Sequence, residues 1–225
     1  MNIQELKDLQ PLVYQQFVTI LEQGRLAHAY LFSGDFASFE MALFLSQALF
    51  CQEKVGVHPC GKCRSCRLIE SNDFSDVTIV APQGNFIKTD TIRELVKNFS
   101  QSGFESSQQV FIIRDAEKMH VNAANSLLKV IEEPQSTIHI FLLTNQEEAV
   151  LPTIKSRTQI ISFPQNLPYL ERFLEEEGLL KTQASLIARL VSSQEEAKRL
   201  ATNKSFIDLL DQAKKFTELL LTDSN

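Results

Sequence analysis

The chain has 225 residues, 44% of them hydrophobic and 22% charged, and its formal net charge is -6. This composition is typical of a globular protein with one large core or two modest ones. The negative charge argues against a module that grips DNA by itself, because such modules neutralise phosphates with clustered lysine and arginine. The sequence has no apolar run of the roughly 18 residues that a membrane helix needs, and its N-terminus lacks the apolar core of a signal peptide. We therefore expect a cytoplasmic protein that does not span a membrane.

Up to Phe163, apolar runs that predict strands alternate with amphipathic runs that predict helices. The predicted strands are Ala29–Ser33, Asp76–Val80, Val110–Ile113, Ile138–Thr144 and Gln159–Phe163. The predicted helices are Leu9–Gln23, Ser38–Phe50, Cys63–Ser71, Asp90–Phe99 and Asn122–Glu133. Gly24 lies just past the first helix, and Pro134 is expected to stop the last one. The alternation indicates an α/β domain with a mainly parallel sheet.

The pattern changes at Pro164. From Leu167 to Leu221 the sequence has only helical periodicity, which predicts a small all-helical unit. Its helices are expected near 168–177, 180–191, 194–201 and 205–221. The α/β domain therefore covers 1–163 and contains a cysteine-rich insertion at about 51–66.

The turn after the first predicted strand is where a phosphate-binding P-loop would lie. Such a loop has the pattern G-x-x-x-x-G-K-[ST], in which backbone N–H groups and the lysine hold phosphates and the hydroxyl holds Mg²⁺. Here only Gly34 is kept, because Phe39 replaces the second glycine, Glu40 the lysine and Met41 the hydroxyl. Reversing a unit charge at about 4 Å changes the interaction by several kcal/mol, so we expect no bound ATP. If this segment is considered alone, the alternative to an altered P-loop is a strand–turn–helix that has no relation to P-loops.

A second ATPase element is also altered. The strand that would end in an Asp-Glu pair, for Mg²⁺ and for the attacking water, is followed instead by Arg114 and Asp115. An arginine therefore stands where the metal-binding aspartate belongs. Two independent changes predict an inactive ATP site more strongly than either one does.

All four cysteines fall within 16 residues of the chain. They are Cys51, Cys60, Cys63 and Cys66. In a reducing cytosol such a cluster indicates a metal site, and four thiolates suit tetrahedral Zn²⁺ without an open position, so the zinc would be structural. An iron–sulfur cluster, disulfides and unpaired thiols are the alternatives. The neighbouring Lys62, Arg64 and Arg67 either bind nucleic acid or form a solvated face.

Four segments carry a family resemblance. They are the run Gly24–Gly34, the Cys-x8-Cys-x2-Cys-x2-Cys insertion, the helix Asn125–Pro134 and the pair Ser156-Arg157. In order and spacing they resemble the AAA+ subunits of bacterial DNA polymerase III clamp loaders, and the delta-prime family in particular. The resemblance is strong over residues 10–163 and weak over the helical tail. The related gamma/tau ATPase subunits share the zinc insertion and the Ser-Arg motif, but their P-loop is intact.

The resemblance implies a non-hydrolysing subunit that works with gamma/tau ATPase subunits and a delta subunit to load the sliding clamp onto primed DNA. Arg157, with Ser156, would act in trans on a γ-phosphate held by a neighbour, where an arginine contributes roughly 10³–10⁵ in rate. The alternative for Arg157 is a surface arginine paired with a carboxylate. Glu132 and Glu133 form either an acidic helix end or part of an interface. Asn145 takes a sensor position whose role lapses without nucleotide.

The sequence departs from the family in two places. Thr158 stands where the family has cysteine after Ser-Arg. The family also has a helical lid domain, here 164–204, and a third, collar domain, of which 205–225 would be the truncated start.

Two other functions stay open, a catalytic AAA+ motor and a zinc-ribbon nucleic-acid-binding module. The altered ATP site disfavours the motor, and the negative net charge disfavours the nucleic-acid-binding module. In isolation we expect no enzyme activity, although the chain would be part of the polymerase holoenzyme.

Overall fold

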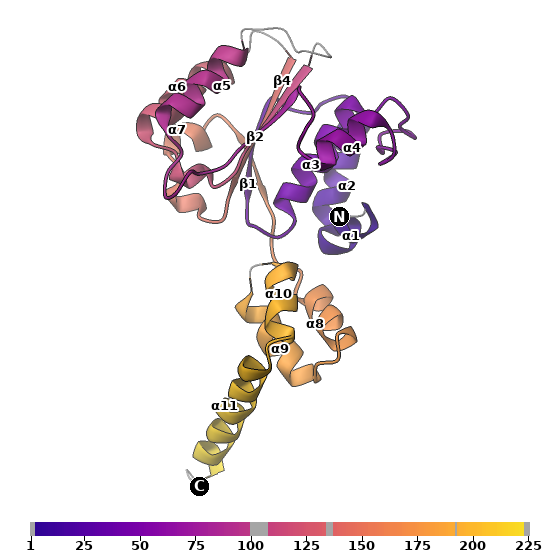
Figure 1. Ribbon diagram of the computed structural model, residues 1–225, viewed down its shortest axis with the longest axis vertical. Helices are drawn as coiled ribbons and strands as arrows, with labels where there is room; N and C mark the ends of the chain where they lie inside the picture. The colour runs from indigo at the N-terminus through magenta and orange to yellow at the C-terminus, as the bar shows by residue number, and fades with distance from the viewer. Residues whose placement is uncertain (1–2, 100–107, 134–136, 192, 223–225) are drawn as a thin grey trace. The chain divides into compact units, whose positions relative to one another are not determined.

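The computed structural model describes residues 3–99, 108–133, 137–191 and 193–222 (Figure 1). The chain divides into two compact units, Met1–Pro164 and Gln165–Asn225. Within the described residues, the structure contains no helix with the length and apolar character needed to cross a membrane.

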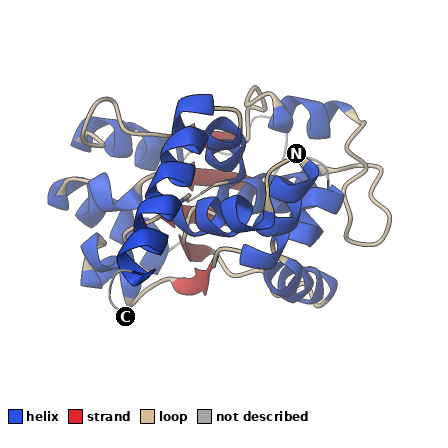
Figure 2. Cartoon of the chain, turned by 90° about the horizontal axis from the view of Figure 1, so that it is seen from below, coloured by secondary structure: helices blue, strands red, loops and turns tan. Residues whose placement is uncertain are grey.

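The first unit is a five-stranded parallel sheet between two groups of helices (Figures 1 and 2). The strand order is β2-β3-β4-β1-β5, which places β1 between β4 and β5. The strands are β1 Ala29–Ser33, β2 Val77–Val80, β3 Gln108–Ile113, β4 Thr137–Thr144 and β5 Gln159–Ser162. The helices are α1 Ile3–Leu9, α2 Pro11–Glu22, α3 Ser38–Phe50, α4 Arg64–Glu70, α5 Thr89–Phe99, α6 Val121–Glu132 and α7 Pro152–Lys155. The predicted α/β fold with a parallel sheet is confirmed.

Alternate residues of β1 face the two helical layers. Leu31 belongs to a buried cluster that includes residues of α5 and α6, such as Ile92 and Leu127. On the other face Phe32 packs against Phe17 of α2, with the ring centroids 5.5 Å apart. Figure 1 shows α5 and α6 on one side of the sheet and α1 to α4 on the other. Burial on both faces is why the central strands are continuous apolar runs.

The N-terminal helical region differs from the prediction. One helix was expected over Leu9–Gln23, but two helices form, α1 and α2, with Gln10 between them. Pro11 has no backbone N–H and is suited to the first position of a helix, so α2 begins there. Gln10 is buried, and its amide nitrogen donates to the carbonyl oxygens of Phe36 at 2.9 Å and Pro164 at 2.7 Å.

Two other differences concern connections. The segment Glu147–Lys155, for which no helix or strand was predicted, contains the short 3-10 helix η2 (Glu147–Ala149) and the helix α7. A further 3-10 helix, η1 (Ala116–Lys118), follows β3. Such short turns have too few residues to give a helical pattern in the sequence. Pro134, the expected stop of α6, lies outside the described residues.

The second unit is all-helical within the described residues. Its helices are α8 Leu167–Glu176, α9 Lys181–Leu190, α10 Gln194–Ala201 and α11 Lys204–Thr222. The side chains of Asn166 and Ser193 accept backbone N–H groups at the starts of α8 and α10, at 3.2 Å each. Gln183 of α9 donates to Asp211 of α11 at 2.9 Å. The division of this region into a lid domain and a collar domain stays a prediction.

Gly34 is expected to be essential for the fold. Its φ is +113°, and a Cβ at this position would lie 2.3 Å from the carbonyl oxygen of Phe163. Gly34→Ala should therefore lower the free energy of unfolding by about 2–4 kcal/mol. Gly24→Ala is the matched control, because Gly24 also has positive φ (+64°) but has no atom within 4 Å of an added Cβ; its cost should be about 1 kcal/mol. Urea denaturation measures both, and equal losses would contradict the close-approach explanation.

Candidate functional site

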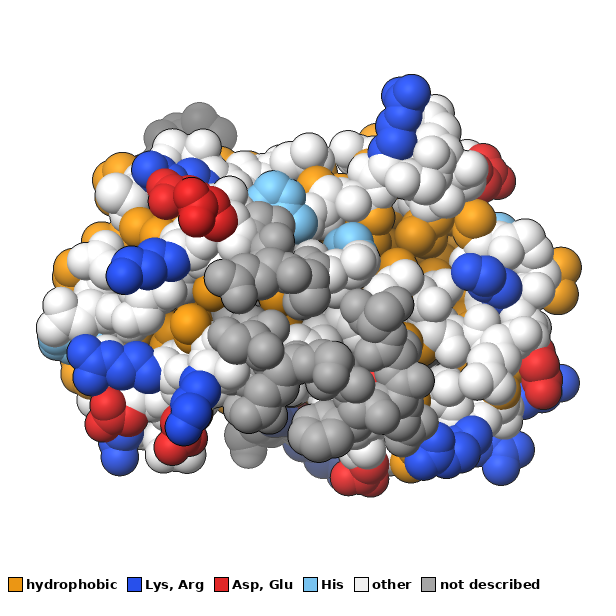
Figure 3. All heavy atoms as spheres, turned by 90° about the horizontal axis from the view of Figure 1, so that it is seen from above, with side chains coloured by type: hydrophobic (Ala, Val, Ile, Leu, Met, Phe, Trp, Pro, Cys, Tyr) orange, Lys and Arg blue, Asp and Glu red, His pale blue; other side chains and the backbone are white. Residues whose placement is uncertain are grey.

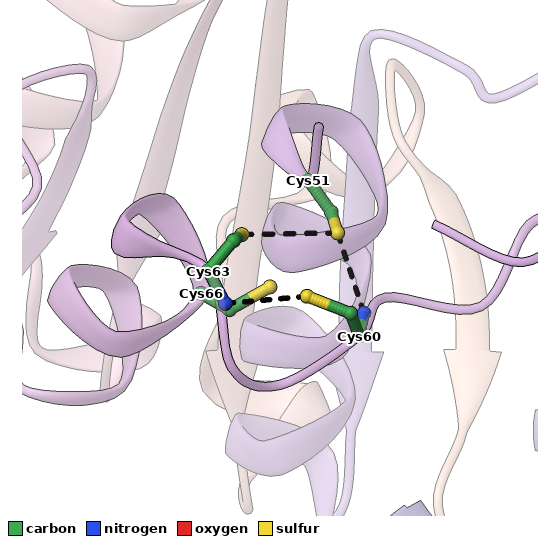
Figure 4. Close-up of side chains that lie close together, drawn as sticks. All are labelled: Cys51, Cys60, Cys63 and Cys66. Atoms are coloured by element: carbon green, nitrogen blue, oxygen red, sulfur yellow. Dashed lines mark hydrogen bonds between the residues drawn. The ribbon is translucent and has the colours of Figure 1, made fainter. Parts of the chain in front are cut away.

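The four cysteines converge on one point at the end of α3. Cys51 directly follows α3, Cys60 lies in the connecting loop, Cys63 precedes α4 and Cys66 is within α4. Their sulfur atoms all lie within 4.8 Å of one another, and the Cys51 and Cys63 sulfurs are 3.9 Å apart (Figure 4). Four sulfurs at about 2.3 Å from a tetrahedral ion would be separated by roughly 3.8 Å. The arrangement therefore fits a metal ion with four sulfur ligands.

Backbone N–H groups point at these sulfurs. The N–H of Cys60 donates to Cys51 Sγ at 3.3 Å, and the N–H groups of Lys62 and Cys63 donate to Cys60 Sγ at 3.4 and 3.2 Å. Gly61 permits the tight turn between them with a φ of +67°. Hydrogen bonds of this kind favour the thiolate form, which is the form that binds metal.

The thiols differ in their acidity. Burial raises the pKa of Cys63, but hydrogen bonds from its neighbours outweigh burial and lower this pKa to about 7. Burial raises the pKa of Cys51 and of Cys66. All four cysteines are free of disulfides. His58 lies apart from the cluster, with its ring 6.2 Å from that of Tyr14.

The basic residues next to the cluster are exposed. Lys62, Arg64 and Arg67 all face solvent. On the face drawn in Figure 3, lysine and arginine side chains are interspersed with carboxylates, and outside the grey atoms no continuous basic patch is visible. The exposure of Lys62, Arg64 and Arg67 fits both alternatives, a nucleic-acid contact and a solvated face.

The turn after β1 leads to a shallow hollow at the sheet edge where the strands end. The hollow is lined by Gly34, Asp35, Ser38, Phe39, Arg114, Asp115, Leu143, Thr144 and Asn145. The guanidinium carbon of Arg114 lies over the ring of Phe39, 4.8 Å from its centroid, a cation–π contact. Two of the residues that replace the ATPase motifs are thus in contact. Both residues line the hollow that follows β1.

Carboxylates line the same hollow. The Asp115 carboxylate pairs with Lys118 at 3.4 Å, and Asp115 has a left-handed backbone with φ of +51°. Asp35 is exposed, and so is Asn145 at the end of β4. The negative charges of Asp35 and Asp115 are unfavourable neighbours for a triphosphate.

Glu40 is not among the residues that line this hollow, although the charges of Asp35 and Arg114 act on its carboxyl group. It lines a separate hollow together with Ile3 and Leu6 of α1 and Glu70 of α4, and burial raises the pKa of its carboxyl group. Met41 is fully buried. The repulsion of phosphate by Glu40 stays a prediction.

Arg157 lies just after α7, where its side chain contacts the end of α6. Its Nε donates to the carboxylate of Glu132, and its Nη1 donates to Thr153 O and to Ser156 Oγ, at 3.2 Å each. The Arg157 and Glu132 side chains are 39% and 46% exposed. Thr158 Oγ1 donates to Ile154 O at 3.0 Å, so the residue that replaces the family cysteine closes the end of α7.

The pairing of Arg157 with Glu132 joins two residues that the sequence analysis had treated separately. It agrees with the carboxylate-paired surface arginine that was kept as an alternative. The partners are 25 residues apart in the chain. No sequence signal identifies this contact, because it depends on where the ends of α6 and α7 meet.

The family model described as DNA polymerase III, delta subunit, matches residues 9–166. The chain is 37% identical over 219 residues to the DNA polymerase III subunit delta' of Bacillus subtilis, covering 96% of this chain and 66% of that protein. It is 33% identical over 175 residues to the subunit gamma/tau of Mycobacterium tuberculosis, covering 73% of this chain and 30% of that protein. The chain thus spans only part of the length of these relatives.

Similarity to a solved structure of low sequence identity bears on the fold only. The Thermotoga maritima RuvB Holliday junction branch migration motor superposes with a TM-score of 0.52 and 13% identity, covering 89% of this chain and 62% of that one. This similarity agrees with the arrangement of the parallel sheet and its helices.

We expect the purified chain to hold one metal ion at the cysteine cluster, because its four sulfurs have the spacing of a closed tetrahedral site. Replacing Cys63 by serine should remove at least half of the bound metal and lower the thermal midpoint, since metal binding contributes folding free energy. Ser71→Ala, at an exposed hydroxyl just past α4, should change neither. Elemental analysis of chelator-free protein makes the measurement. Less than about half an equivalent of metal in the unmodified chain would count against the site.

Proposed function

Because this chain belongs to the DNA polymerase III delta' family, we propose that it is a non-hydrolysing subunit of a clamp loader that places the sliding clamp on primed DNA. Its proposed partners are gamma/tau ATPase subunits, which are also similar to this chain, and a delta subunit. The clamp and the DNA would be engaged through the assembled complex. The observation that carries the proposal is the hollow after β1, in which Phe39 and Arg114 contact each other where nucleotide phosphates would bind.

The absence of ATP hydrolysis is supported by this contact rather than by charge reversal alone. Close approach of a phosphate needs a glycine at the position of Phe39, and Mg²⁺ needs a carboxylate at the position of Arg114. The ring and the guanidinium replace both. A catalytic motor would have to displace a cation–π contact and still lack the lysine, so we do not favour that alternative.

For the metal, we propose structural Zn²⁺. Four cysteine sulfurs and no nearby histidine form a ligand set that zinc accepts in closed sites. With all four positions taken by the protein, there is no place for a reactive water, so the ion would hold α3, the connecting loop and α4 together. The same four sulfurs could ligate an iron–sulfur cluster, and elemental analysis distinguishes the two.

Arg157 is the residue that we propose to act in trans. It is partly exposed, and its Nη1 is held by Thr153 and Ser156 at the end of α7. A guanidinium anchored on one side can present its remaining N–H groups to a phosphate on a neighbouring subunit. An arginine supplied in this way stabilises the charge of the phosphoryl-transfer transition state.

We expect the isolated chain to show no saturable ATP binding up to millimolar concentration. Glu40→Lys alone should not restore binding, because Phe39 and Arg114 would still contact each other in the hollow after β1. Titration with a fluorescent ATP analogue tests both proteins, with a gamma/tau subunit as the positive control. Micromolar binding by the unmodified chain would refute the inactive site and favour the motor.

In a reconstituted clamp loader, Arg157→Ala should slow the ATP site that Arg157 serves by about 10³-fold, because that site loses a trans-acting charge. The total ATP turnover of the complex should fall only by the fraction that this one site contributes. Lysine should rescue incompletely, since it lacks the planar fork of arginine. Arg199→Ala, which removes another exposed ion-paired arginine, is the control. Single-turnover ATPase rates of gel-filtered complexes give the result, and unchanged rates with Arg157→Ala in an intact complex would rule out the role.

A further inference from the structure

The guanidinium of Arg157 has two kinds of partner. Nη1 donates to Thr153 O and Ser156 Oγ, which belong to its own turn of chain. Nε donates to the carboxylate of Glu132, at the last residue of α6. Among the described residues, none accepts a hydrogen bond from Nη2. The side chain is therefore anchored on its Nη1 side and engaged by an anion on its Nε side.

A phosphate and a carboxylate compete for the same part of a guanidinium. Both accept parallel N–H groups from one edge of the fork, and the edge formed by Nε and Nη2 is one of the edges suited to bidentate binding. Glu132 takes Nε and so occupies part of that edge. A phosphate bound there would have to displace Glu132, but it would not have to disturb the contacts of Nη1.

The contact with Glu132 is suited to exchange. Both side chains are partly open to solvent, at 39% and 46% exposure, and ion pairs of this exposure are weak because water and salt screen them. A phosphate carries more charge and can use both nitrogens of the edge. A γ-phosphate from a neighbour can therefore displace Glu132, although the free energy of the ion pair with Glu132 is lost when it does.

We propose that Glu132 is an internal competitor that controls the availability of Arg157. In the absence of a nucleotide-loaded neighbour the carboxylate holds the guanidinium edge, and a phosphate presented in trans must replace it. Glu132 thereby weakens the contact of this chain with a bound triphosphate and makes the arginine responsive to nucleotide. This inference rests on the proposed trans role of Arg157 and adds a residue that sets its strength.

The test uses complexes reconstituted with Glu132→Gln, Glu133→Gln, Arg157→Ala and the Glu132→Gln/Arg157→Ala double variant. Glu133→Gln is the matched control, because it makes the same change in the next residue of the chain. Glu132→Gln should lower the dissociation constant of a slowly hydrolysed ATP analogue by about two- to five-fold, the range that exposed ion pairs span. It should leave kcat unchanged or raised. The double variant should behave as Arg157→Ala does, because no arginine remains to be released.

The possible outcomes separate the two proposals. If Arg157→Ala has no effect, both the trans role and the competition are wrong. If Arg157→Ala slows turnover but Glu132→Gln weakens the binding of the analogue, Glu132 supports the arginine and the competition is refuted. Equal effects of Glu132→Gln and Glu133→Gln would also refute it, since the result would then reflect net charge.

Discussion

The hollow after β1 depends on how closely the turn that follows β1 approaches the end of β5. The N–H of Gly34 donates to Thr144 O at 2.8 Å, and no Cβ would fit between Gly34 and the Phe163 carbonyl. The Gln10 side chain donates to Phe36 O on this turn and to Pro164 O beyond β5. Groups of the protein therefore fix the turn without a phosphate. The close approach to Phe163 is enough to explain why residue 34 is glycine, although phosphate binding would also require a glycine there.

With the turn fixed in this way, side chains that line the neighbouring hollow can contact one another. Arg114 at the end of β3 packs over Phe39 of α3 and so connects two elements that bound nucleotide would connect in an ATPase. The cysteine cluster connects the far end of α3 to α4, and Gln47 Nε2 adds a hydrogen bond to Cys66 O at 3.0 Å. Helix α3 is thus held at both ends by side chains of the chain itself. A helix tied at both ends fits the proposed function of presenting one arginine to a neighbour.

Much of the fold could be predicted from the sequence, for identifiable reasons. β1 matches its predicted bounds because it is buried on both faces and is therefore uniformly apolar. β3 begins earlier than predicted, at Gln108, because Gln108 and Gln109 are polar yet pair with Thr137 and Ile138 of β4. The cysteine cluster was recognisable because ligand spacing is a local property of sequence. Two features needed the structure, the side that Glu40 faces, which depends on the unpredicted α1, and the contact of Glu132 with Arg157.

We propose that this chain binds no nucleotide in the assembled complex because its own side chains occupy the hollow after β1. Photolabelling of the reconstituted clamp loader with a photoreactive ATP analogue, followed by peptide mapping of each subunit, tests it most directly. We predict label on the gamma/tau subunits and none on this chain, with competition by unlabelled ATP. Competable label on the peptide that contains residues 34–41 would contradict the account.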